Sequence, residues 1–572
     1  MRSGARRRKR LPMRGFAIAA CLLCACSDSE GDRSADVSVT DVGLEVRAEV
    51  TADVVSDLTE VVEPVDYPAL DVVWTPCDEL AGEPHARVDC AEVVAPLDWE
   101  HPDGETITLF VKRVRSAAWD TDPGAPRRAL WLLMGGPGQA GAGGEGTVVA
   151  LAQRDPGLDL YLPDHRGTGR STRLTCPLQE GPLSHGGEAI VESEWPVCRD
   201  VLLAKWGERL AFFSTTQAAH DTAALIAAVH APEDQVVVIG ISYGTYLTNR
   251  YLQVAPQHSG GLADAVVLDS IAAPGACRLS GSDVWEDAVA RQILAHCPDD
   301  PACAARFSGP SGVWDALGDL YDDIAAGHCP ITGEPEQDIE LLKTALGNLA
   351  FSFAGRRAMP ALIHRYQRCD EADVHVIRSV YERTFGYDPG AAAPGPLTGF
   401  SWTLSTNIVV SEMWEPSDPS PDELVERWQA TRSCRGVSKQ LAWQIPGWPR
   451  YVEPLRDAFA DFAALGIPVL AMNGDLDPAT PAEQARTIEP HLVAAAHQRY
   501  LEIPGAAHGV IAQGQLLSDA TTTCGRELLL QFVRDPEAEL DTGCLADTKP
   551  LGFFMRDEAV EYYFGTPDMW GD

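Results

Sequence analysis

Basic residues are scarce in this chain. Of its 572 residues, 45 are Lys or Arg and 83 are Asp or Glu, which gives a net charge of −38 at pH 7. Nucleic acids are bound by clustered cations, and no basic patch follows the first residues, so we expect no nucleic acid partner. The acidic balance indicates solubility and mutual repulsion, and by itself it identifies no substrate.

An apolar run long enough to remain in a membrane is also missing. The run at residues 16–25 follows seven Lys or Arg residues and is shorter than the ~20 residues of a spanning helix. It ends in Leu-Cys-Ala-Cys at residues 23–26, which resembles a lipobox, where cleavage precedes a cysteine that becomes lipidated. We therefore predict that residues 1–26 are a lipoprotein signal peptide, that the protein is exported, and that Cys26 anchors it in a membrane. Cys24 is the competing lipidation site, an ordinary signal peptide is the alternative, and Ser27 in place of Asp favours the outer membrane.

Cysteine pairs with zinc-site spacing are absent after residue 26. Twelve of the 15 cysteines lie there, and none forms a Cys-x-x-Cys motif with a second such pair, so we expect no metal. In the oxidising compartment that export implies, all of them are expected to form disulfides. Near neighbours suggest four bonds: Cys77–Cys90, Cys176–Cys198, Cys297–Cys303 and Cys524–Cys544. The pairing of the other four is left open: Cys277, Cys329, Cys369 and Cys434.

Aromatic residues are missing from residues 27–66, which hold 12 Asp or Glu and two Arg. Such a segment buries too little surface to offset its ordering entropy. We therefore predict that residues 27–70 form an acidic disordered tether between the lipid and the folded part.

Short apolar runs follow the tether. Residues 91–97 and 106–114 read as an antiparallel hairpin, and six later runs have the continuous apolar character of strands buried on both faces. These runs are residues 129–134, 158–162, 235–239, 265–268, 468–472 and 499–503. Helical stretches between several of them predict an α/β fold with a mostly parallel sheet and helices on both faces.

One helix-rich interval interrupts this alternation between two consecutive strands. We therefore predict a first core part at residues 71–270, a helical cap insertion at 271–451, and a second core part at 452–572. Doubly wound sheets place their sites at the carboxyl ends of the strands, where the cap would lie.

Ser242 is the candidate nucleophile. It lies in Gly240-Ile241-Ser242-Tyr243-Gly244, between a buried strand and a helical stretch. A sharp strand-to-helix turn with small neighbours is what a nucleophile elbow requires.

A serine hydroxyl needs a base, and the base needs an orienting acid, which in this arrangement follow in the order Ser, acid, His. Asp477 follows the strand at 468–472, and His508 follows the strand at 499–503. We predict that Ser242, Asp477 and His508 form a catalytic triad. Asp475 is better suited to turning the loop, and Asp269 is the lesser alternative for the acid.

The glycine-rich segment after the strand at 129–134 is the candidate oxyanion hole. Backbone N–H groups of Gly135, Gly136 and Tyr243 are expected to face the developing negative charge. A phosphate-binding loop is the rival interpretation, but no Gly-Lys-Ser/Thr follows and the glycines form no Rossmann fingerprint. Residues 164–171 are interpreted as a structural turn whose Asp and Arg brace nearby loops.

Five segments together resemble the tripeptidyl aminopeptidase and proline iminopeptidase group of serine peptidases. They are Gly-Gly-Pro-Gly at 135–138, Asp-His-Arg-Gly-Thr-Gly-Arg-Ser at 164–171, Gly-Ile-Ser-Tyr-Gly at 240–244, Gly-Asp-Leu-Asp-Pro-Ala-Thr-Pro at 474–481 and Gly-Ala-Ala-His at 505–508. The resemblance runs from about Trp74 to Cys544. It implies an α/β-hydrolase fold with a mostly parallel eight-stranded sheet and an inserted helical cap. It also implies a serine exopeptidase that acts on peptides with a free N-terminus and needs no cofactor.

Two positions depart from that family's pattern. Met134 stands where a His usually precedes the glycines, and Ser411 stands where a cap cysteine precedes an acid. The acid, Glu412, is the candidate ligand for a substrate α-ammonium, and a surface Glu on a cap helix is the alternative. An ester substrate with the same triad, and a non-catalytic surface lipoprotein, are the rival functions.

Overall fold

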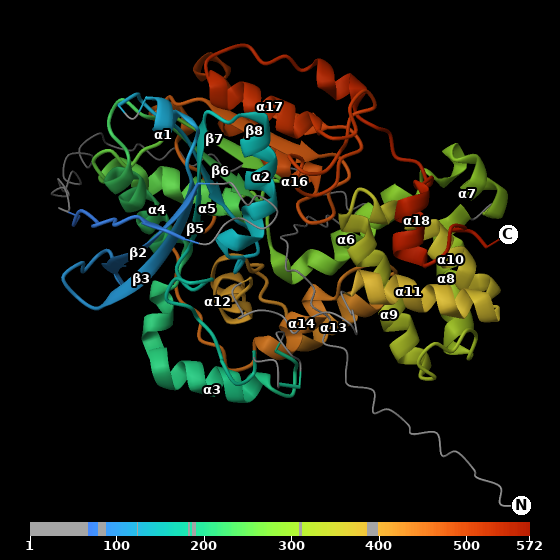
Figure 1. Ribbon diagram of the computed structural model, residues 1–572. Coiled ribbons are helices and arrows are strands. Elements are labelled where there is room, and N and C mark those ends of the chain that lie inside the picture. Colours follow the sequence, from blue (N-terminus) through green and yellow to red (C-terminus); the bar gives the residue numbers. More distant parts are fainter. Residues whose placement is uncertain are drawn as a thin grey trace, which may run out of the picture.

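The computed structural model describes residues 67–77, 87–122, 124–180, 184–185, 190–307, 312–385 and 399–571 (Figure 1). The predicted signal peptide with Cys26, and the predicted tether up to residue 66, lie outside these residues. Residues 67–70, which we assigned to the tether, belong to the folded part, because Tyr67 stacks on His258 with ring centroids 4.3 Å apart and Leu70 is buried. In the part of the chain that is described, no helix has both the length and the apolar character needed to cross a bilayer.

The described residues form a nine-stranded sheet, in the order β1-β2-β3-β5-β4-β6-β7-β8-β9. Its first strands, β1 (Thr75–Pro76), β2 (Val88–Pro96) and β3 (Thr106–Val114), pair antiparallel, and β3 pairs antiparallel with β5 (Leu158–Asp164). The hairpin prediction is confirmed. The sheet has one strand more than predicted, because the two-residue β1 is too short to leave a pattern in the sequence.

The rest of the sheet is parallel. The strands are β5, β4 (Arg128–Leu133), β6 (Gln235–Ile241), β7 (Ala265–Asp269), β8 (Val469–Gly474) and β9 (Gln498–Ile503). Every residue of β5, β7 and β8 is buried, as expected for strands covered on both faces. The predicted α/β fold is confirmed, and the loops after these strands meet at their shared carboxyl edge.

Side chains alternate between the two faces along β4. Trp131 joins the hydrophobic core under α4 (Thr215–Val229) and α5 (Tyr243–Val254), whereas Leu130 and Leu132 join the core under α2 (Glu145–Arg154) and α17 (Cys524–Arg534). This alternation follows from the two-residue period of a strand. The other described α-helices outside the insertion and before α17 are α1 (Ala118–Thr121), α3 (Trp195–Trp206), α15 (Phe462–Leu465) and α16 (Ala482–Ala485).

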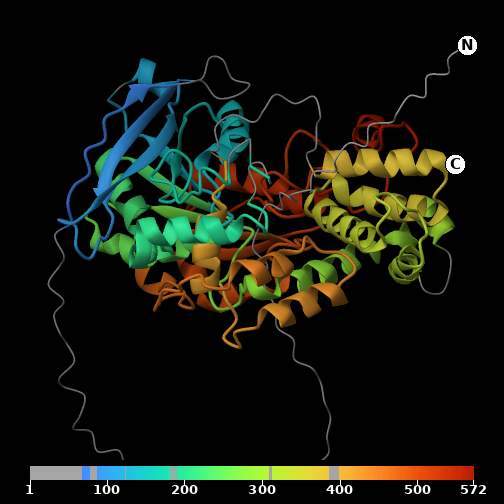
Figure 2. The ribbon, with the colours of Figure 1, turned by 90° about the horizontal axis from the view of Figure 1, so that it is seen from below.

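The long interval between β7 and β8 is helical, as expected. Its helices are α6 (Ser282–Leu294), α7 (Pro301–Arg306), α8 (Gly312–Ala325), α9 (Pro335–Phe351), α10 (Met359–Arg368), α11 (Glu371–Thr384), α12 (Trp402–Glu412), α13 (Pro421–Ala430) and α14 (Val437–Gln444). Figures 1 and 2 show α8, α10 and α11 grouped to one side of the sheet. They share a hydrophobic core of their own, separate from the two cores of the sheet.

The end of the chain packs with this helical insertion. Helix α18 (Asp557–Phe564) contacts α11, and Phe553, Phe564 and Trp570 are buried in the core of the insertion. The Arg365 guanidinium donates a hydrogen bond of 2.9 Å to the Met569 carbonyl. Residues from about 551 onwards, which we grouped with the second core part, therefore pack with the insertion, because their large apolar side chains are buried there.

Five disulfides join cysteines within the described residues and stabilise the fold. The four predicted from near spacing, Cys77–Cys90, Cys176–Cys198, Cys297–Cys303 and Cys524–Cys544, are present, and Cys329–Cys369 is the fifth. The expectation that all twelve cysteines would pair is wrong, because Cys277 and Cys434 belong to none of these bonds. Cys277 is buried in a core of the sheet, whereas the Cys434 sulfur lies 3.0 Å from the Thr431 hydroxyl, so they occupy different environments.

Candidate active site

Ser242 occupies the sharp turn between β6 and α5. Its backbone has φ 59° and ψ −127°, a conformation that is strained for a residue with a side chain. A Cβ at Gly240 would lie 2.2 Å from the Gly244 carbonyl oxygen, and one at Gly244 would lie 2.0 Å from the Leu133 carbonyl oxygen. Both glycines are therefore required for β6, the turn and β4 to pack this closely.

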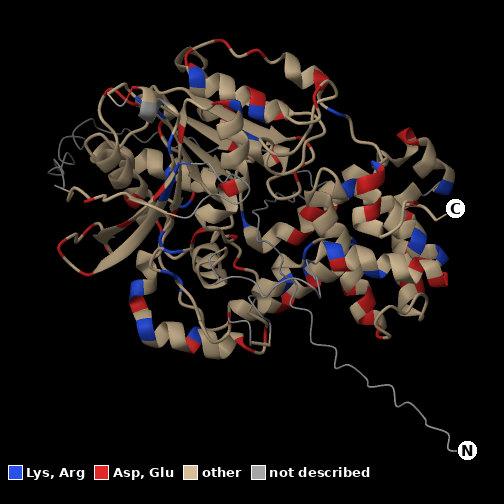
Figure 3. Cartoon of the chain, in the orientation of Figure 1, with Lys and Arg blue, Asp and Glu red and all other residues tan. Residues whose placement is uncertain are grey.

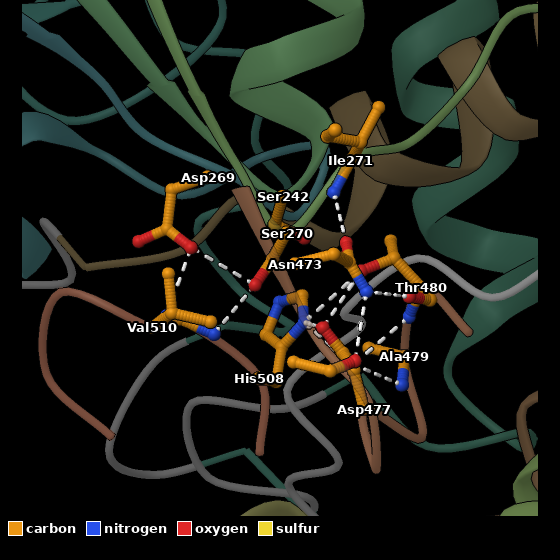
Figure 4. Close-up of polar contacts among 12 residues, drawn as sticks. Ser242, Asp269, Ser270, Ile271, Asn473, Asp477, Ala479, Thr480, His508 and Val510 are labelled. Atoms are coloured by element: carbon orange, nitrogen blue, oxygen red, sulfur yellow. Dashed lines mark hydrogen bonds and ion pairs between the residues drawn. The ribbon is translucent and has the colours of Figure 1, made fainter. Parts of the chain in front are cut away.

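Asp477 and His508 lie together at the carboxyl edge of the sheet. The Nδ1 atom of His508 is 3.0 Å and 2.9 Å from the two carboxylate oxygens of Asp477 (Figure 4). Asp477 also accepts hydrogen bonds from the Ala479 and Thr480 amides and from the Thr480 hydroxyl. Burial acts to raise the pKa of Asp477, but the imidazole and these donors outweigh it and lower the pKa, which favours the carboxylate.

The hydrogen bond expected between Ser242 and His508 is not formed. The Ser242 hydroxyl and the Nε2 atom of His508 are both buried, and neither has a hydrogen-bond partner among the described residues. Buried polar atoms without partners are rare and costly, and a catalytic role is one explanation for them, because catalytic hydrogen bonds often form only when substrate is bound. The structure thus brings the acid and the base together and leaves the hydroxyl and the imidazole available at the same edge of the sheet.

Asp269 connects the turn that holds Ser242 with the loop that holds His508. Its backbone carbonyl accepts a hydrogen bond of 2.9 Å from the Ser242 amide. Its carboxylate accepts hydrogen bonds of 2.8 Å and 3.2 Å from the Val510 and Ile511 amides. These contacts assign Asp269 to positioning the loop and leave Asp477 as the acid that contacts the imidazole.

The glycine segment after β4 lies against the nucleophile turn. A Cβ at Gly135 would lie 2.8 Å from the Ser242 Cβ and 3.2 Å from its hydroxyl oxygen, so the backbone of Gly135 borders the hydroxyl. Gly136 has φ +114°, a conformation that favours glycine. Tyr243 follows Ser242 directly and begins α5. Gly135 and Tyr243 of the predicted oxyanion hole therefore lie beside Ser242, and Gly136 follows Gly135 in the chain.

The turn at residues 164–171 braces the loops, as predicted. The buried Arg166 guanidinium forms a salt bridge of 2.6 Å with Asp221 and donates to the Pro96, Leu97 and Phe212 carbonyls. Asp164 accepts hydrogen bonds from the Gly141 and Arg170 amides.

Glu412 lies at the end of α12 and is completely buried, so the alternative of a surface glutamate is wrong. Its Oε1 atom accepts hydrogen bonds of 2.8 Å from the Thr215 amide and 2.6 Å from the Tyr451 hydroxyl. Its Oε2 atom has no partner within the described residues. Burial raises the pKa of Glu412, and the nearby Arg250 opposes that rise. The Thr215 hydroxyl in turn lies 2.8 Å from the Tyr243 hydroxyl. Thr215 therefore connects Glu412 with Tyr243, the residue that follows Ser242.

Sequence reasoning missed several residues that support the site. The Thr480 hydroxyl donates to the Asp477 carboxylate, a contact that the three-residue spacing of Asp and Thr could have suggested. The Phe351 ring, from the end of α9, lies 6.0 Å from the His508 ring. No local signal identified Phe351, because its contact depends on how the insertion packs on the sheet.

One group of potential metal ligands occurs among the described residues, formed by Asp98, Glu100 and His101. Glu100 and His101 are exposed, the group follows β2, and it includes none of the candidate catalytic residues.

Comparisons with known proteins agree with this geometry. A family model described as the alpha/beta hydrolase fold matches residues 129–287. Serine protease Hip1 of Mycobacterium tuberculosis is 26% identical over 311 residues, which are 51% of this chain and 52% of that protein. Tripeptidyl aminopeptidase of Streptomyces coelicolor is 27% identical over 222 residues, 36% of this chain and 38% of that protein. The chain thus spans about half the length of the first of these relatives and less of the second.

Among solved structures, that of Candida antarctica lipase A in its closed state covers 85% of each chain at 10% identity and a TM-score of 0.29, a similarity too low to bear on function. The family model and the parallel sheet agree on the fold, and the two sequence relatives are peptidases. The chain thus has the α/β-hydrolase fold, and it is similar in sequence to a serine protease and a tripeptidyl aminopeptidase.

Proposed function

We propose that this protein is a serine hydrolase that cleaves peptide bonds through an acyl-enzyme intermediate. The observation that carries the proposal is the contact of His508 Nδ1 with Asp477, at the sheet edge where a buried Ser242 hydroxyl has no partner among the described residues. The names of the two sequence relatives, a serine protease and an aminopeptidase, support the peptide substrate.

Each residue has a distinct role in the proposed reaction. The Ser242 oxygen attacks the scissile carbonyl while Nε2 of His508 takes its proton, and Asp477 orients the imidazole and stabilises its charged form. The same proton is then given to the leaving amine, and an ester forms between Ser242 and the acyl part. Water, activated by His508, hydrolyses this ester and restores the serine hydroxyl. Backbone amides of Gly136 and Tyr243 stabilise the oxyanion of each tetrahedral intermediate.

The proposed specificity is for peptides with a free N-terminus. The Oε2 atom of Glu412 is a buried carboxylate oxygen without a partner among the described residues, and an α-ammonium group would satisfy it. Such an anchor, at a fixed distance from Ser242, limits cleavage to a bond near the N-terminus.

Labelling with a fluorophosphonate probe tests the nucleophile. The wild type and a Ser259→Ala control, which changes an exposed serine, are expected to react, and Ser242→Ala is expected not to react while keeping the same circular dichroism. Labelling of a folded Ser242→Ala variant would refute the assignment.

A comparison of substrates tests the reaction class. Aminoacyl arylamides are expected to be hydrolysed, and their N-acetylated forms are expected to be poor substrates. Rapid hydrolysis of short-chain p-nitrophenyl esters with negligible hydrolysis of arylamides would instead identify an esterase with the same triad.

We also propose that the protein is exported and anchored through Cys26. The five disulfides support an oxidising compartment. Metabolic labelling with a palmitate analogue should mark the wild type and Cys24→Ser but not Cys26→Ser, and the reverse result would move the anchor to Cys24.

A further inference from the structure

A cavity lined by none of the candidate catalytic residues lies where the C-terminal segment meets the helical insertion and the loop after β9. It has a volume of about 680 Å³ and is lined by residues of three segments, 353–357, 515–520 and 549–563. We call it the C-terminal cavity. Its size is in the range of small-molecule sites, which are ~300–1,000 Å³.

Three cations line the C-terminal cavity: Arg357, Lys549 and Arg556. Among the described residues, the buried Arg357 donates side-chain hydrogen bonds to two backbone carbonyls, those of Phe353 and Pro550. For Lys549 and Arg556, the described residues provide no hydrogen bond or ion pair to their side-chain nitrogens. The one carboxylate in the lining, Glu558, forms no ion pair with any of the three in the described chain.

This concentration of positive charge is unusual in a protein of net charge −38. Acidic residues are spread over both the sheet-bearing part and the helical insertion (Figure 3), yet within the described chain none of them forms an ion pair with the three cations of this cavity. Burial lowers the pKa of Lys549, and the charges of Arg357 and Arg556 lower it further. Burial likewise lowers the pKa of Arg357, to about 10. An anion in the cavity would therefore offset the desolvation of Arg357 and Lys549 and the repulsion among the three cations.

Apart from the three cations, Glu558 and Gln515, the lining consists of apolar and aromatic residues, and part of it is open to solvent. Phe554, Leu517 and Tyr562 are 72%, 61% and 52% exposed, which is high for side chains of this kind. Phe353 also lines the cavity, with the Arg357 guanidinium 4.1 Å from its ring centre. Cations beside exposed apolar side chains match a ligand with an anionic head and an apolar stem.

We propose that the C-terminal cavity binds an amphipathic carboxylate, with the carboxylate against Lys549, Arg556 and Arg357 and the apolar stem against Phe554, Tyr562 and Leu517. The carboxylate of a fatty acid and the C-terminal carboxylate of an apolar peptide share this chemistry. The site is separate from the proposed hydrolase reaction and does not depend on it.

Calorimetric titration of the full chain with decanoate tests the proposal, because decanol keeps the stem without the charge and acetate keeps the charge without the stem. Decanoate is expected to bind, and decanol and acetate are expected to bind at least about tenfold more weakly. Protein already labelled at its active serine should bind decanoate with unchanged affinity. Raising the ionic strength should weaken the binding.

Two variants locate the ligand. Lys549→Gln and Arg556→Gln are each expected to weaken decanoate binding by at least about fivefold, since each removes a charged contact. Lys205→Gln is the matched control, because it removes one positive charge from an exposed position on α3 and should leave the affinity within about twofold. Should Lys549→Gln fail to fold, Arg556→Gln retains the test, because that side chain is exposed.

The source of the carboxylate is resolved by a second titration, with an N-acetylated apolar tetrapeptide and its C-terminal amide. Binding of the free acid but not of the amide, with loss in Lys549→Gln, supports a peptide ligand, and binding of decanoate alone supports a fatty acid. Either result supports the site. Unchanged decanoate affinity in both cavity variants, or no binding of either carboxylate, overturns it.

Discussion

The Val510 amide donates a hydrogen bond of 2.8 Å to the Asp269 carboxylate, and this contact ties the end of β7 to the loop that carries His508. The same Asp269 receives the Ser242 amide on its backbone carbonyl. One residue at a strand end thus positions both the proposed nucleophile and the proposed base.

Replacement of Asp269 by Ala should therefore impair activity without touching the triad. The Val510 and Ile511 amides would lose their acceptor, and each unpaired buried amide costs about 1–3 kcal/mol. We expect a lower melting temperature and a kcat reduced at least about tenfold, with Asp269→Asn retaining more activity because its side-chain oxygen still accepts one amide. Equal kcat in the Ala variant and the wild type would show that the loop holds its position without this contact.

Asp269 should also give stability a defined pH dependence. Burial raises its pKa from 3.8 to about 6, so the folded state holds the proton more tightly than the unfolded state. The contribution of Asp269 to the free energy of unfolding is complete below its pKa in the unfolded state. This contribution is lost as the pH rises towards about 6, which lowers the free energy of unfolding by about 3 kcal/mol. The stability of the wild type relative to Asp269→Asn should therefore fall between pH 4 and pH 6, measured by urea unfolding. A constant difference would contradict the raised pKa.

Thr480 is expected to act through Asp477. Its hydroxyl donates a hydrogen bond of 2.9 Å to the carboxylate that contacts His508. In Thr480→Val this donor is lost at nearly constant volume, and we expect kcat to fall roughly tenfold or more with little change in KM, since hydrogen bonds to charged groups contribute about 1.5–3 kcal/mol. Thr480→Ser should restore most of the rate. A change in KM alone would indicate a role in substrate binding instead.

Glycine at position 244, in the turn that holds Ser242, should not be replaceable by a residue with a side chain. A Cβ at Gly244 would meet the Leu133 carbonyl oxygen at 2.0 Å, so Gly244→Ala should lower stability by at least about 2 kcal/mol or prevent folding. Gly146→Ala is the control, because nothing lies within 4 Å of its Cβ and it lies in α2. That control should raise stability by about 0.5–1 kcal/mol, as alanine does in helices. Thermal unfolding of both variants makes the comparison.

Glu412 is expected to distinguish free from blocked N-termini. Glu412→Gln removes the charge that would pair with an α-ammonium, so KM for free peptides should rise about tenfold while hydrolysis of their N-acetylated forms stays the same. Glu426→Gln, an exposed position on α13, should change neither constant. An unchanged ratio between the two substrates in Glu412→Gln would assign this buried carboxylate a purely structural role.

Much of the fold and of the candidate site could be predicted because the signals were local. The strands β6 and β8 are largely apolar runs, and Ser242, Asp477 and His508 follow the ends of β6, β8 and β9 within five residues. The carboxyl ends of parallel strands share one edge of the sheet, so the sheet topology alone brings these three residues together. Their proximity could therefore be predicted without knowing how distant segments pack. The contact of Asp477 with His508 follows from that placement.

The parts that could not be predicted depend on contacts between distant segments. The unmade hydrogen bond between Ser242 and His508, the packing of Phe351 against His508 and the burial of Glu412 all depend on how separate segments of the chain settle against one another. The pairing of Cys329 with Cys369 across 40 residues is of the same kind. Neither periodicity nor spacing records such contacts.

The packing of α18 on α11 makes the insertion a poor candidate for exchange between hydrolases. The insertion leaves the sheet after β7 and returns before β8, and the far end of the chain then supplies Phe553, Phe564 and Trp570 to its interior. A chimaera that replaced only the residues between β7 and β8 would leave these three aromatic side chains exposed to solvent. Shuffling this module between proteins therefore requires two separate cuts in the gene, one for the internal stretch and one for the tail.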